Sequence, residues 1–231
     1  AQYKMVNILI RLPGHYFKSM HKKSPNDITF SRGCLGDKEE ITEFLRSQNK
    51  DRAFGFCFED KFDEINFRLE RWSHSLLENF ILARDKKGKI MGLTFLWSPS
   101  PSKKIKIEKL QTFLKLYFYL QKLFKKSPKE GSELEVLYLN FLELRKSLSE
   151  SDKRQLFSSM INYIYDLPIS KDYHALSYCA FEGTPTDNLK GHIKHETSLS
   201  LYLVQRRQKI GEDGEMPEIG AIPPGFEMSL V

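Results

Sequence analysis

The sequence predicts one α/β domain, on the strength of three observations. Apolar runs rich in strand-forming residues alternate along the chain with segments of helical spacing. Two of these runs, joined by a short glycine-bearing turn within residues 79–97, predict a β-hairpin. The length of 231 residues, of which 40% are hydrophobic, suffices for one sizeable core, so we expect a single domain with an insertion.

The first third of the chain is expected to hold two strands and two helices. Residues 3–12 are apolar and end before a Pro-Gly pair, and residues 27–34 form a second short apolar run. Asp37 is a candidate N-cap for the helix that follows, whose first turn carries acids where the helix dipole favours them. Helical spacing over about 62–77 predicts another helix before the hairpin.

The remaining two thirds continue the alternation of strands and helices. The longest apolar run, 133–145, is typical of a central strand buried on both faces, and a Ser-Glu-Ser-Asp sequence then predicts a capped helix. A linker is expected over 98–104 and a helix over 107–126. Strands are expected over 174–181 and 197–205, with a short helix or loop between them. The tail from Gln208 to Pro224 is expected to be irregular, and the last residues, 225–231, to add an edge strand.

Composition points to a cytoplasmic protein. Cys34, Cys57 and Cys179 form neither an even set at short spacing nor a metal-ligand cluster, so we expect reduced thiols and no metal. The N-terminal residues have no cleavage site of the secretory type, and no apolar run approaches the roughly 20 residues that a membrane span needs. Because the first residue is not Met, a trimmed chain or a piece of a longer protein is compatible with the sequence.

Local patterns in the second half resemble the GCN5-related N-acetyltransferase family. Ile90, Met91 and Gly92 stand where that family's central hairpin has an Ile-x-Gly pattern, and the apolar run 137–144, its capped helix and the run 174–181 resemble the cofactor-binding half. The resemblance covers roughly 27–205. It implies a mixed, largely antiparallel central sheet flanked by helices. It also implies acetyl-CoA, or another acyl-CoA, as the cofactor. Outside the resemblance, the residue pattern predicts an inserted basic helix, placed at 104–127, and an irregular tail over 206–231.

The sequence departs from the family at the cofactor loop. The family has Arg/Gln-x-x-Gly-x-Gly/Ala, in which bare backbone amides at a helix N-terminus bind pyrophosphate, whereas residues 148–153 contain no glycine and two acids. The candidates for cofactor binding that the resemblance leaves are Leu142, Leu144, Ser149, Ser151, Lys153 and Arg154. The alternative is an ordinary capped helix whose acids complement the dipole.

Catalytic candidates follow from where the family places acid and base groups. Glu143 is the candidate on the long strand, and Tyr178 lies in the next strand. The alternative for Glu143 is a surface acid at the end of a strand, because unpaired acids are seldom buried. His192 and His195 also lie in the region where the family has such groups, but they are expected on a solvated face. They do not predict a metal site, because a second pair of ligands at metal-binding spacing is missing.

The positive charge is concentrated in one segment. Residues 103–126 hold eight lysines and one acid, an excess larger than the net charge of +6 of the whole chain. The alternatives are a helix packed on the sheet with solvated lysines, or a docking surface for an acidic protein or an anionic membrane, with nucleic acid the least favoured partner.

Two functions remain open from the sequence. One is an acyl-CoA-dependent N-acyltransferase acting on an unidentified amine. The other is a non-catalytic binding module on the same scaffold, in which the altered loop no longer takes CoA and the basic segment recruits a partner.

Overall fold

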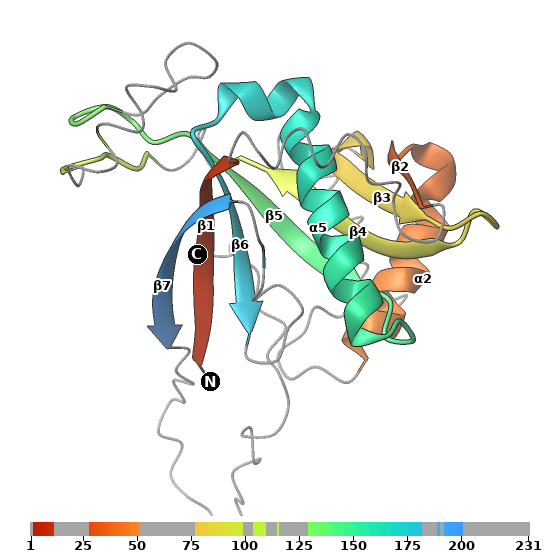
Figure 1. The fold of residues 1–231 in the computed structure, drawn as a ribbon. Coiled ribbons are helices and arrows are strands. Elements are labelled where there is room, and N and C mark those ends of the chain that lie inside the picture. Colours follow the sequence, from red (N-terminus) through yellow and green to blue (C-terminus); the bar gives the residue numbers. More distant parts are fainter. Residues whose placement is uncertain are drawn as a thin grey trace, which may run out of the picture.

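The structure is a computed structural model that describes residues 2–11, 28–50, 77–98, 104–109, 115, 129–181, 189 and 192–200. These residues form a seven-stranded sheet in the order β2-β3-β4-β5-β6-β1-β7 (Figure 1). All neighbouring strands are antiparallel except β5 and β6. The strands are β1 (Gln2–Arg11), β2 (Thr29–Arg32), β3 (Phe80–Arg84), β4 (Ile90–Trp97), β5 (Val136–Leu144), β6 (Ala175–Phe181) and β7 (His192–Ser200). The predicted fold class, a mixed and largely antiparallel sheet flanked by helices, is therefore confirmed.

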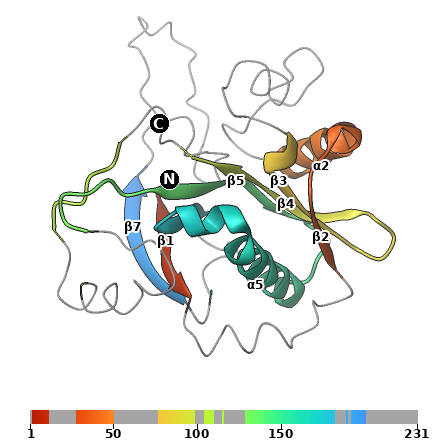
Figure 2. The same cartoon turned by 90° about the horizontal axis from the view of Figure 1, so that it is seen from above.

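Two helices cover opposite faces of this sheet. Helix α2 (Lys38–Asn49) lies on one face and α5 (Glu150–Asp166) on the other (Figure 2). Short 3-10 turns, η2 (Leu35–Asp37), η3 (Leu77–Asn79) and η4 (Pro168–Asp172), precede α2, β3 and β6. The expected helix over 62–77 and the tail over 206–231 lie outside the described residues, apart from Leu77, which begins η3.

Each helix closes its own hydrophobic core. The core beneath α5 includes Leu137 and Leu139 of β5 and Leu176 and Tyr178 of β6. The core beneath α2 joins that helix to β3, β4 and one residue of β5; its buried members are Ile41, Phe44, Leu45, Phe80, Leu82, Ile90, Leu93, Phe95 and Phe141. The side chains of β5 are therefore divided between the two cores, as expected for a central strand buried on both faces.

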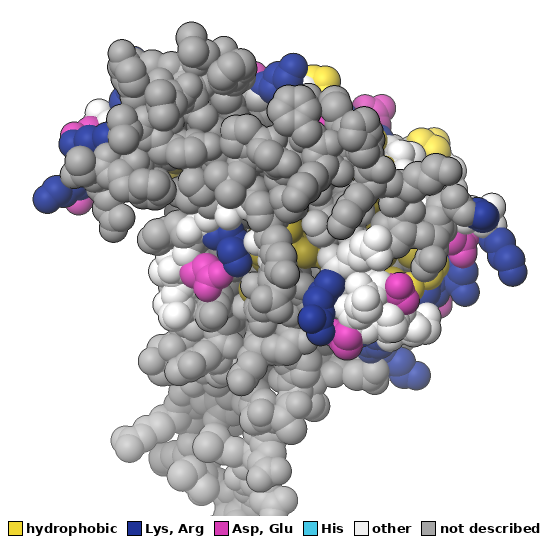
Figure 3. All heavy atoms as spheres, viewed as in Figure 1, with side chains coloured by type: hydrophobic (Ala, Val, Ile, Leu, Met, Phe, Trp, Pro, Cys, Tyr) yellow, Lys and Arg dark blue, Asp and Glu magenta, His cyan; other side chains and the backbone are white. Residues whose placement is uncertain are grey.

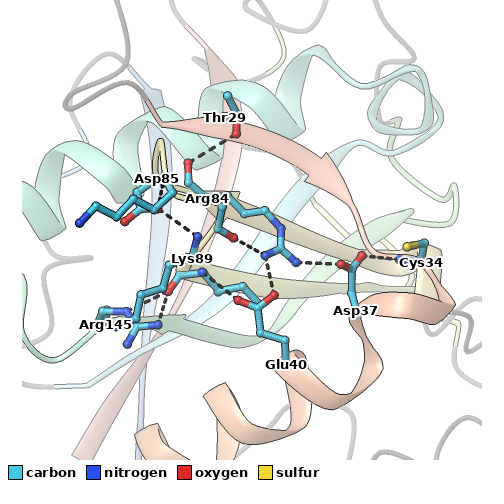
Figure 4. Close-up of polar contacts among 11 residues, drawn as sticks. Thr29, Cys34, Asp37, Glu40, Arg84, Asp85, Lys89 and Arg145 are labelled. Carbon is cyan, nitrogen blue, oxygen red and sulfur yellow. Dashed lines mark hydrogen bonds and ion pairs between the residues drawn. The ribbon is translucent and has the colours of Figure 1, made fainter.

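Helix α2 is tied to the predicted hairpin by charged side chains. Arg84 donates from Nη2 to Asp37 Oδ1 at 2.8 Å and from Nη1 to Glu40 (Figure 4). Asp37 occupies the N-cap position of α2, but its carboxylate accepts from the Cys34 amide at 2.8 Å instead of capping the helix. The cap predicted for Asp37 is therefore replaced by a link between η2, α2 and β3.

The sequence predicts the N-terminal strand but not its place in the sheet. Residues 3–12 were expected as a strand, and β1 lies between β6 and β7, antiparallel to both. The strand β7 begins at His192, which corrects the expected loop or short helix before residue 197. Pairing with β1 from Arg11 back to Gln2 holds all nine residues of β7 in extended form.

The predicted basic helix is wrong at its start. Residues 104–109 are not helical but extended, and they pair with the segment that leads into β5. The Ile107 amide donates to Ser132 O at 3.1 Å, and the Leu134 amide donates to Ile105 O at 2.7 Å. The Gly131 amide also donates to Ile107 O at 2.8 Å, so the carbonyls of Ile105 and Ile107 are not free for the i to i+4 bonds that a helix starting here would make. Lys115 is helical, and the rest of 110–128 lies outside the described residues.

Candidate functional site

The parallel strands β5 and β6 separate after three residue pairs. The pairs are Val136–Ala175, Leu137–Leu176 and Tyr138–Ser177. Beyond them β5 runs on to Leu144 and β6 to Phe181, and the two strands diverge in Figure 1. Beyond the third pair, the backbone groups on the facing edges of β5 and β6 are therefore not paired with one another.

A bulge in β5 lies beside this separation. Phe95 is opposite Asn140 and Leu93 is opposite Glu143, so β5 carries one extra residue over this stretch. Phe141 takes a left-handed φ of 48° there, and its ring lies 6.3 Å from that of Phe95 in the core beneath α2. Because an aromatic residue seldom adopts this conformation, the surrounding core must hold the bulge in place.

Two buried polar atoms at the separation have no hydrogen-bond partner among the described residues. Asn140 is 1% exposed and Ser177 is 0% exposed, yet Asn140 Nδ2 and Ser177 Oγ are unpaired in the part of the chain that the structure describes. Both lie on the face opposite α5, since their neighbours Leu139 and Leu176 pack under that helix. Leaving such a group unsatisfied costs about 1–3 kcal/mol, so these two atoms mark a place where a polar ligand would be stabilised.

Tyr138 is the last residue of β5 that pairs with β6. It is 5% exposed, and its ring lies 5.9 Å from that of Trp97. Burial, followed by the nearby Cys179, raises the pKa of the Tyr138 hydroxyl. This phenol is therefore protonated at neutral pH beside the point where the strands part.

Glu143 is buried, which corrects the expectation of a surface acid. It is 4% exposed and lies opposite Leu93, a member of the core beneath α2. Simple alternation from Leu137 and Leu139 would have put Glu143 on the α5 face, and the bulge moves it to the other. The carboxylate therefore lies on the same face of β5 as the unpaired Asn140 amide.

Tyr178 lies on the opposite face of the sheet from Glu143. It is 1% exposed, and its ring meets that of Phe157 of α5 edge to face at 5.3 Å. The structure therefore does not bring the two predicted catalytic residues together. His192 is also buried, at 8% exposure, with its ring 6.0 Å from that of Tyr165, so the solvated position expected for it is wrong; the His195 side chain lies outside the described residues.

The N-terminus of α5 is an ordinary capped helix start. Ser149 Oγ accepts from the Asp152 amide at 3.1 Å, and the Lys153 amide makes the first helical bond, to Ser149 O at 2.9 Å. The first-turn amides that neither bond engages are those of Glu150 and Ser151. The anion site that the resemblance implies is thus reduced to two amides at this turn.

The candidate cofactor residues gather around this turn. Leu142 and Leu144 are partly buried on the α5 side, while Ser151 and Arg154 are exposed. Lys153 donates to Glu150 at 2.8 Å, and this hydrogen bond, followed by the charge of Lys153, lowers the pKa of Glu150. Glu150 is therefore ionised at neutral pH and competes with any phosphate for the ammonium of Lys153.

The loop before α5 is hydrogen-bonded to α2 and to β4. Arg145 Nε donates to Ile90 O at 2.8 Å, and the Arg145 amide donates to Met91 O at 2.9 Å. The Lys146 amide donates to Gln48 Oε1 at 3.2 Å. Sequence reasoning missed Gln48, Asn140 and Ser177; for Asn140 the signal was a lone amide inside the apolar run of β5.

The described part of the basic segment is partly neutralised. Lys104 pairs with Glu133 at 2.8 Å and Lys115 with Glu130 at 2.9 Å. The hydrogen bond between Lys104 and Glu133 raises the pKa of Lys104 and lowers that of Glu133. On the face seen in Figure 3, basic and acidic side chains of the described residues lie next to one another.

The described residues hold neither a metal-ligand cluster nor a membrane-spanning helix. No group of three or more His, Cys, Asp or Glu side chains in the described ranges is arranged to hold a metal ion. Among the described helices, none is long and apolar enough to cross a membrane.

Comparisons with known proteins find only distant structural similarity. No protein-family description and no curated protein matches the chain. Among solved structures, it is similar to the GCN5-related glucosamine N-acetyltransferase region of a fungal multi-domain GH3 β-N-acetylglucosaminidase, with a TM-score of 0.42 and 9% identity over 77% of this chain and 18% of that one. It is also similar to Saccharomyces cerevisiae N-myristoyltransferase with bound myristoyl-CoA, with a TM-score of 0.47 and 11% identity over 85% and 47% of the two chains.

A third similar structure is a functionally unknown conserved protein from Staphylococcus epidermidis. The TM-score is 0.44 and the identity 8%, over 86% of this chain and 60% of that one. The chain thus spans from 18% to 60% of the length of these three structures.

Proposed function

We propose that the protein binds an acyl-CoA between the separated strands β5 and β6 and transfers the acyl group to an amine. The observation that carries the proposal is the separation itself, with the unpaired Asn140 Nδ2 and Ser177 Oγ buried beside it. Two strand edges that leave their ladder offer backbone donors and acceptors to an extended ligand that has amide groups of its own. The pantetheine arm of CoA is such a ligand.

Candidate residues for the phosphates and for the thioester of the acyl-CoA lie at opposite ends of the space between β5 and β6. At the α5 end, the groups proposed for the phosphates are the amides of Glu150 and Ser151 and the side chains of Ser151, Lys153 and Arg154. The Ser149 hydroxyl, the remaining candidate, already donates to Asp152 Oδ2 at 2.7 Å. Leu142 and Leu144 supply the apolar wall along the last part of β5. Asn140, at the bulge, is the residue of β5 proposed to lie near the thioester end of the ligand.

Glu143 is the proposed base for the reaction. A bound acyl-CoA supplies the thioester, and the amine nitrogen forms the new C–N bond as the C–S bond breaks. Glu143 accepts the proton that the amine loses, and the sulfur leaves as a thiolate that is protonated to the CoA thiol. Tyr178 is the less favoured catalytic candidate, because it packs under α5 on the other face of the sheet. Holding both reactants in position supplies much of the rate in such a transfer.

Calorimetric titration of the purified protein with acetyl-CoA tests the proposal. We expect heat of binding for the unaltered protein and weaker binding for Lys153→Glu, which replaces a cation beside the α5 N-terminus. Lys171→Glu is the matched control, because it makes the same charge change in η4, on an exposed residue beyond the other end of α5. Equal affinity in both variants would remove the phosphate site from α5, and absence of binding at about millimolar ligand would overturn the proposal.

The second candidate function is the non-catalytic binding module. Glu150 and Asp152, where the family has a glycine-rich loop, favour it. The ion pairs of Lys104 and Lys115 oppose it, because they reduce the charge that those lysines offer to an acidic protein or an anionic membrane. Binding of anionic but not neutral vesicles, reversed by salt, together with no binding of acetyl-CoA, is the result that would select the module.

A further inference from the structure

Gln48 joins the end of α2 to the loop that begins α5. The two bonded residues, Gln48 and Lys146, are 98 positions apart in the chain. Gln48 is 4% exposed, its Nε2 donates to Ser47 Oγ at 3.1 Å, and its Oε1 accepts from the Lys146 amide at 3.2 Å. A buried amide side chain in the last turn of a surface helix is costly unless it is bonded, so this bond is the physical reason for a glutamine here.

Lys146 lies in a short turn that is closed by a backbone hydrogen bond. The Leu148 amide donates to Arg145 O at 3.1 Å, and Ser149 is the N-cap of α5. Arg145 is fixed on its other side by Ile90 O and by the ring of Phe44, whose centroid lies 5.3 Å from its guanidinium carbon. A displacement of Lys146 is therefore passed on to the N-cap rather than absorbed along a long loop.

We propose that Gln48 is a positioning residue for the phosphate-binding turn: by holding the Lys146 amide, it fixes where the first-turn amides of α5 lie. This inference rests on the proposed function and adds to it, since Gln48 itself touches no ligand and acts through the loop. Binding groups displaced by about 1 Å lose much of their effect, so one bond behind the loop has a measurable influence on affinity.

The alternative is that Gln48 only stabilises α2, and Asn49 offers a matched control for it. Asn49 is the next residue, is 8% exposed, and donates from Nδ2 to Leu45 O at 2.9 Å within the same helix. Asn49→Leu therefore removes a buried amide bond of α2 without touching Lys146. Gln48→Leu removes the bond to the loop, and Gln48→Glu keeps an acceptor oxygen at the same place.

The test combines hydrogen exchange at the Lys146 amide with calorimetric titration of acetyl-CoA on the full chain. We expect Gln48→Leu to speed exchange at Lys146 and to weaken acetyl-CoA binding by about tenfold. Gln48→Glu is expected to restore slow exchange and most of the affinity, and Asn49→Leu to lower the melting temperature while leaving both readouts unchanged.

Two results would overturn the inference while the proposed function stands. One is a Gln48→Leu variant that binds acetyl-CoA as tightly as the unaltered protein, and the other is an Asn49→Leu variant that loses the same affinity as Gln48→Leu. If the unaltered protein binds no acetyl-CoA, that result contradicts the proposed function itself. The inference about Gln48, which rests on the proposed function, is then overturned with it.

Discussion

The guanidinium of Arg84 and the carboxylate of Asp37 form an ion pair at 2.8 Å that joins β3 to the start of α2. The two side chains are only 17% and 22% exposed, so solvent screens the pair less than a surface ion pair. Burial acts to raise the pKa of Asp37, but the hydrogen bonds from Cys34 and the charge of Arg84 outweigh it, and the net pKa lies below the ordinary value.

This relationship predicts how stability depends on pH. Because the pKa of Asp37 is lower in the folded protein, its contribution is present above the ordinary value of 3.8 and is lost as pH falls through the folded pKa. Asp37→Asn is expected to reduce the free energy of unfolding by about 1–2 kcal/mol at neutral pH and by progressively less in strong acid. Denaturant titrations at a series of pH values measure this, with Glu43→Gln as the control, since the pair of Glu43 with Arg46 is exposed. A difference that is constant down to about pH 2 would contradict the assignment.

Gly92 is predicted to be intolerant of a side chain. A Cβ there would lie 2.8 Å from Leu144 Cδ2 and 3.2 Å from both Glu143 O and Met160 Cε. Leu144 has a flexible end, but the carbonyl of Glu143 belongs to the bulged strand, so Gly92→Ala is expected to cost about 1–3 kcal/mol of stability. Gly36→Ala is the control, because its Cβ would meet only Cys34 Sγ at 3.9 Å. Thermal unfolding of the two variants gives the comparison, and equal melting temperatures would contradict the close packing of β4 against β5.

Ser177 is predicted to matter for ligand binding but not for folding. Its hydroxyl is buried and has no hydrogen-bond partner in the described ranges, so Ser177→Ala removes an unsatisfied group and should leave the free energy of unfolding unchanged or slightly higher. Ser170→Ala, by contrast, removes a buried hydroxyl that donates to Ile164 O, and should cost about 1 kcal/mol. In calorimetric titrations with acetyl-CoA, Ser177→Ala is expected to bind the ligand more weakly than the unaltered protein, whereas Ser170→Ala is expected to bind it equally well. A marked loss of stability in Ser177→Ala would show that its hydroxyl has a structural role.

Glu150 is predicted to oppose binding of an anionic ligand at α5. Its pKa is lowered chiefly by the hydrogen bond from Lys153, so it is ionised at neutral pH in the first helical turn. Glu150→Gln removes this charge and frees the ammonium of Lys153, and should tighten acetyl-CoA binding by about threefold or more at low salt. Glu39→Gln, in the first turn of α2, makes the same change away from the site. Calorimetry at two salt concentrations measures both, and unchanged affinity in Glu150→Gln would place the ligand's phosphates elsewhere.

The elements that sequence reasoning predicted best carry their signals locally. The β3–β4 hairpin is set by two apolar runs and a turn in which Gly88 has a φ of 79°. The start of α5 is set by Ser149, whose side chain caps it as the sequence predicts. The strand β5 follows from an apolar run that needs burial on both faces.

The errors arose where a segment's structure depends on a distant one. Residues 104–109 have the composition of a helix start, but pairing with 131–134 holds them extended. Glu143 has the composition of a surface acid, but the bulge at Phe141 turns it toward the core beneath α2. His192 is in a strand because β7 pairs along its length with β1, from the other end of the chain, and its buried ring lies 6.0 Å from that of Tyr165 of α5.

By itself, the sequence determined the elements whose signals are local, namely α2, the β3–β4 hairpin, β5 and α5, because hydrophobic period, capping residues and turn residues act within a few positions. Only the tertiary structure decided which side chains meet. The separation of β5 from β6, the unpaired Asn140 and Ser177, and the hold of Gln48 on Lys146 all join residues that are far apart in the chain. Their positions follow from how the two layers pack against the sheet, and no local pattern encodes that packing.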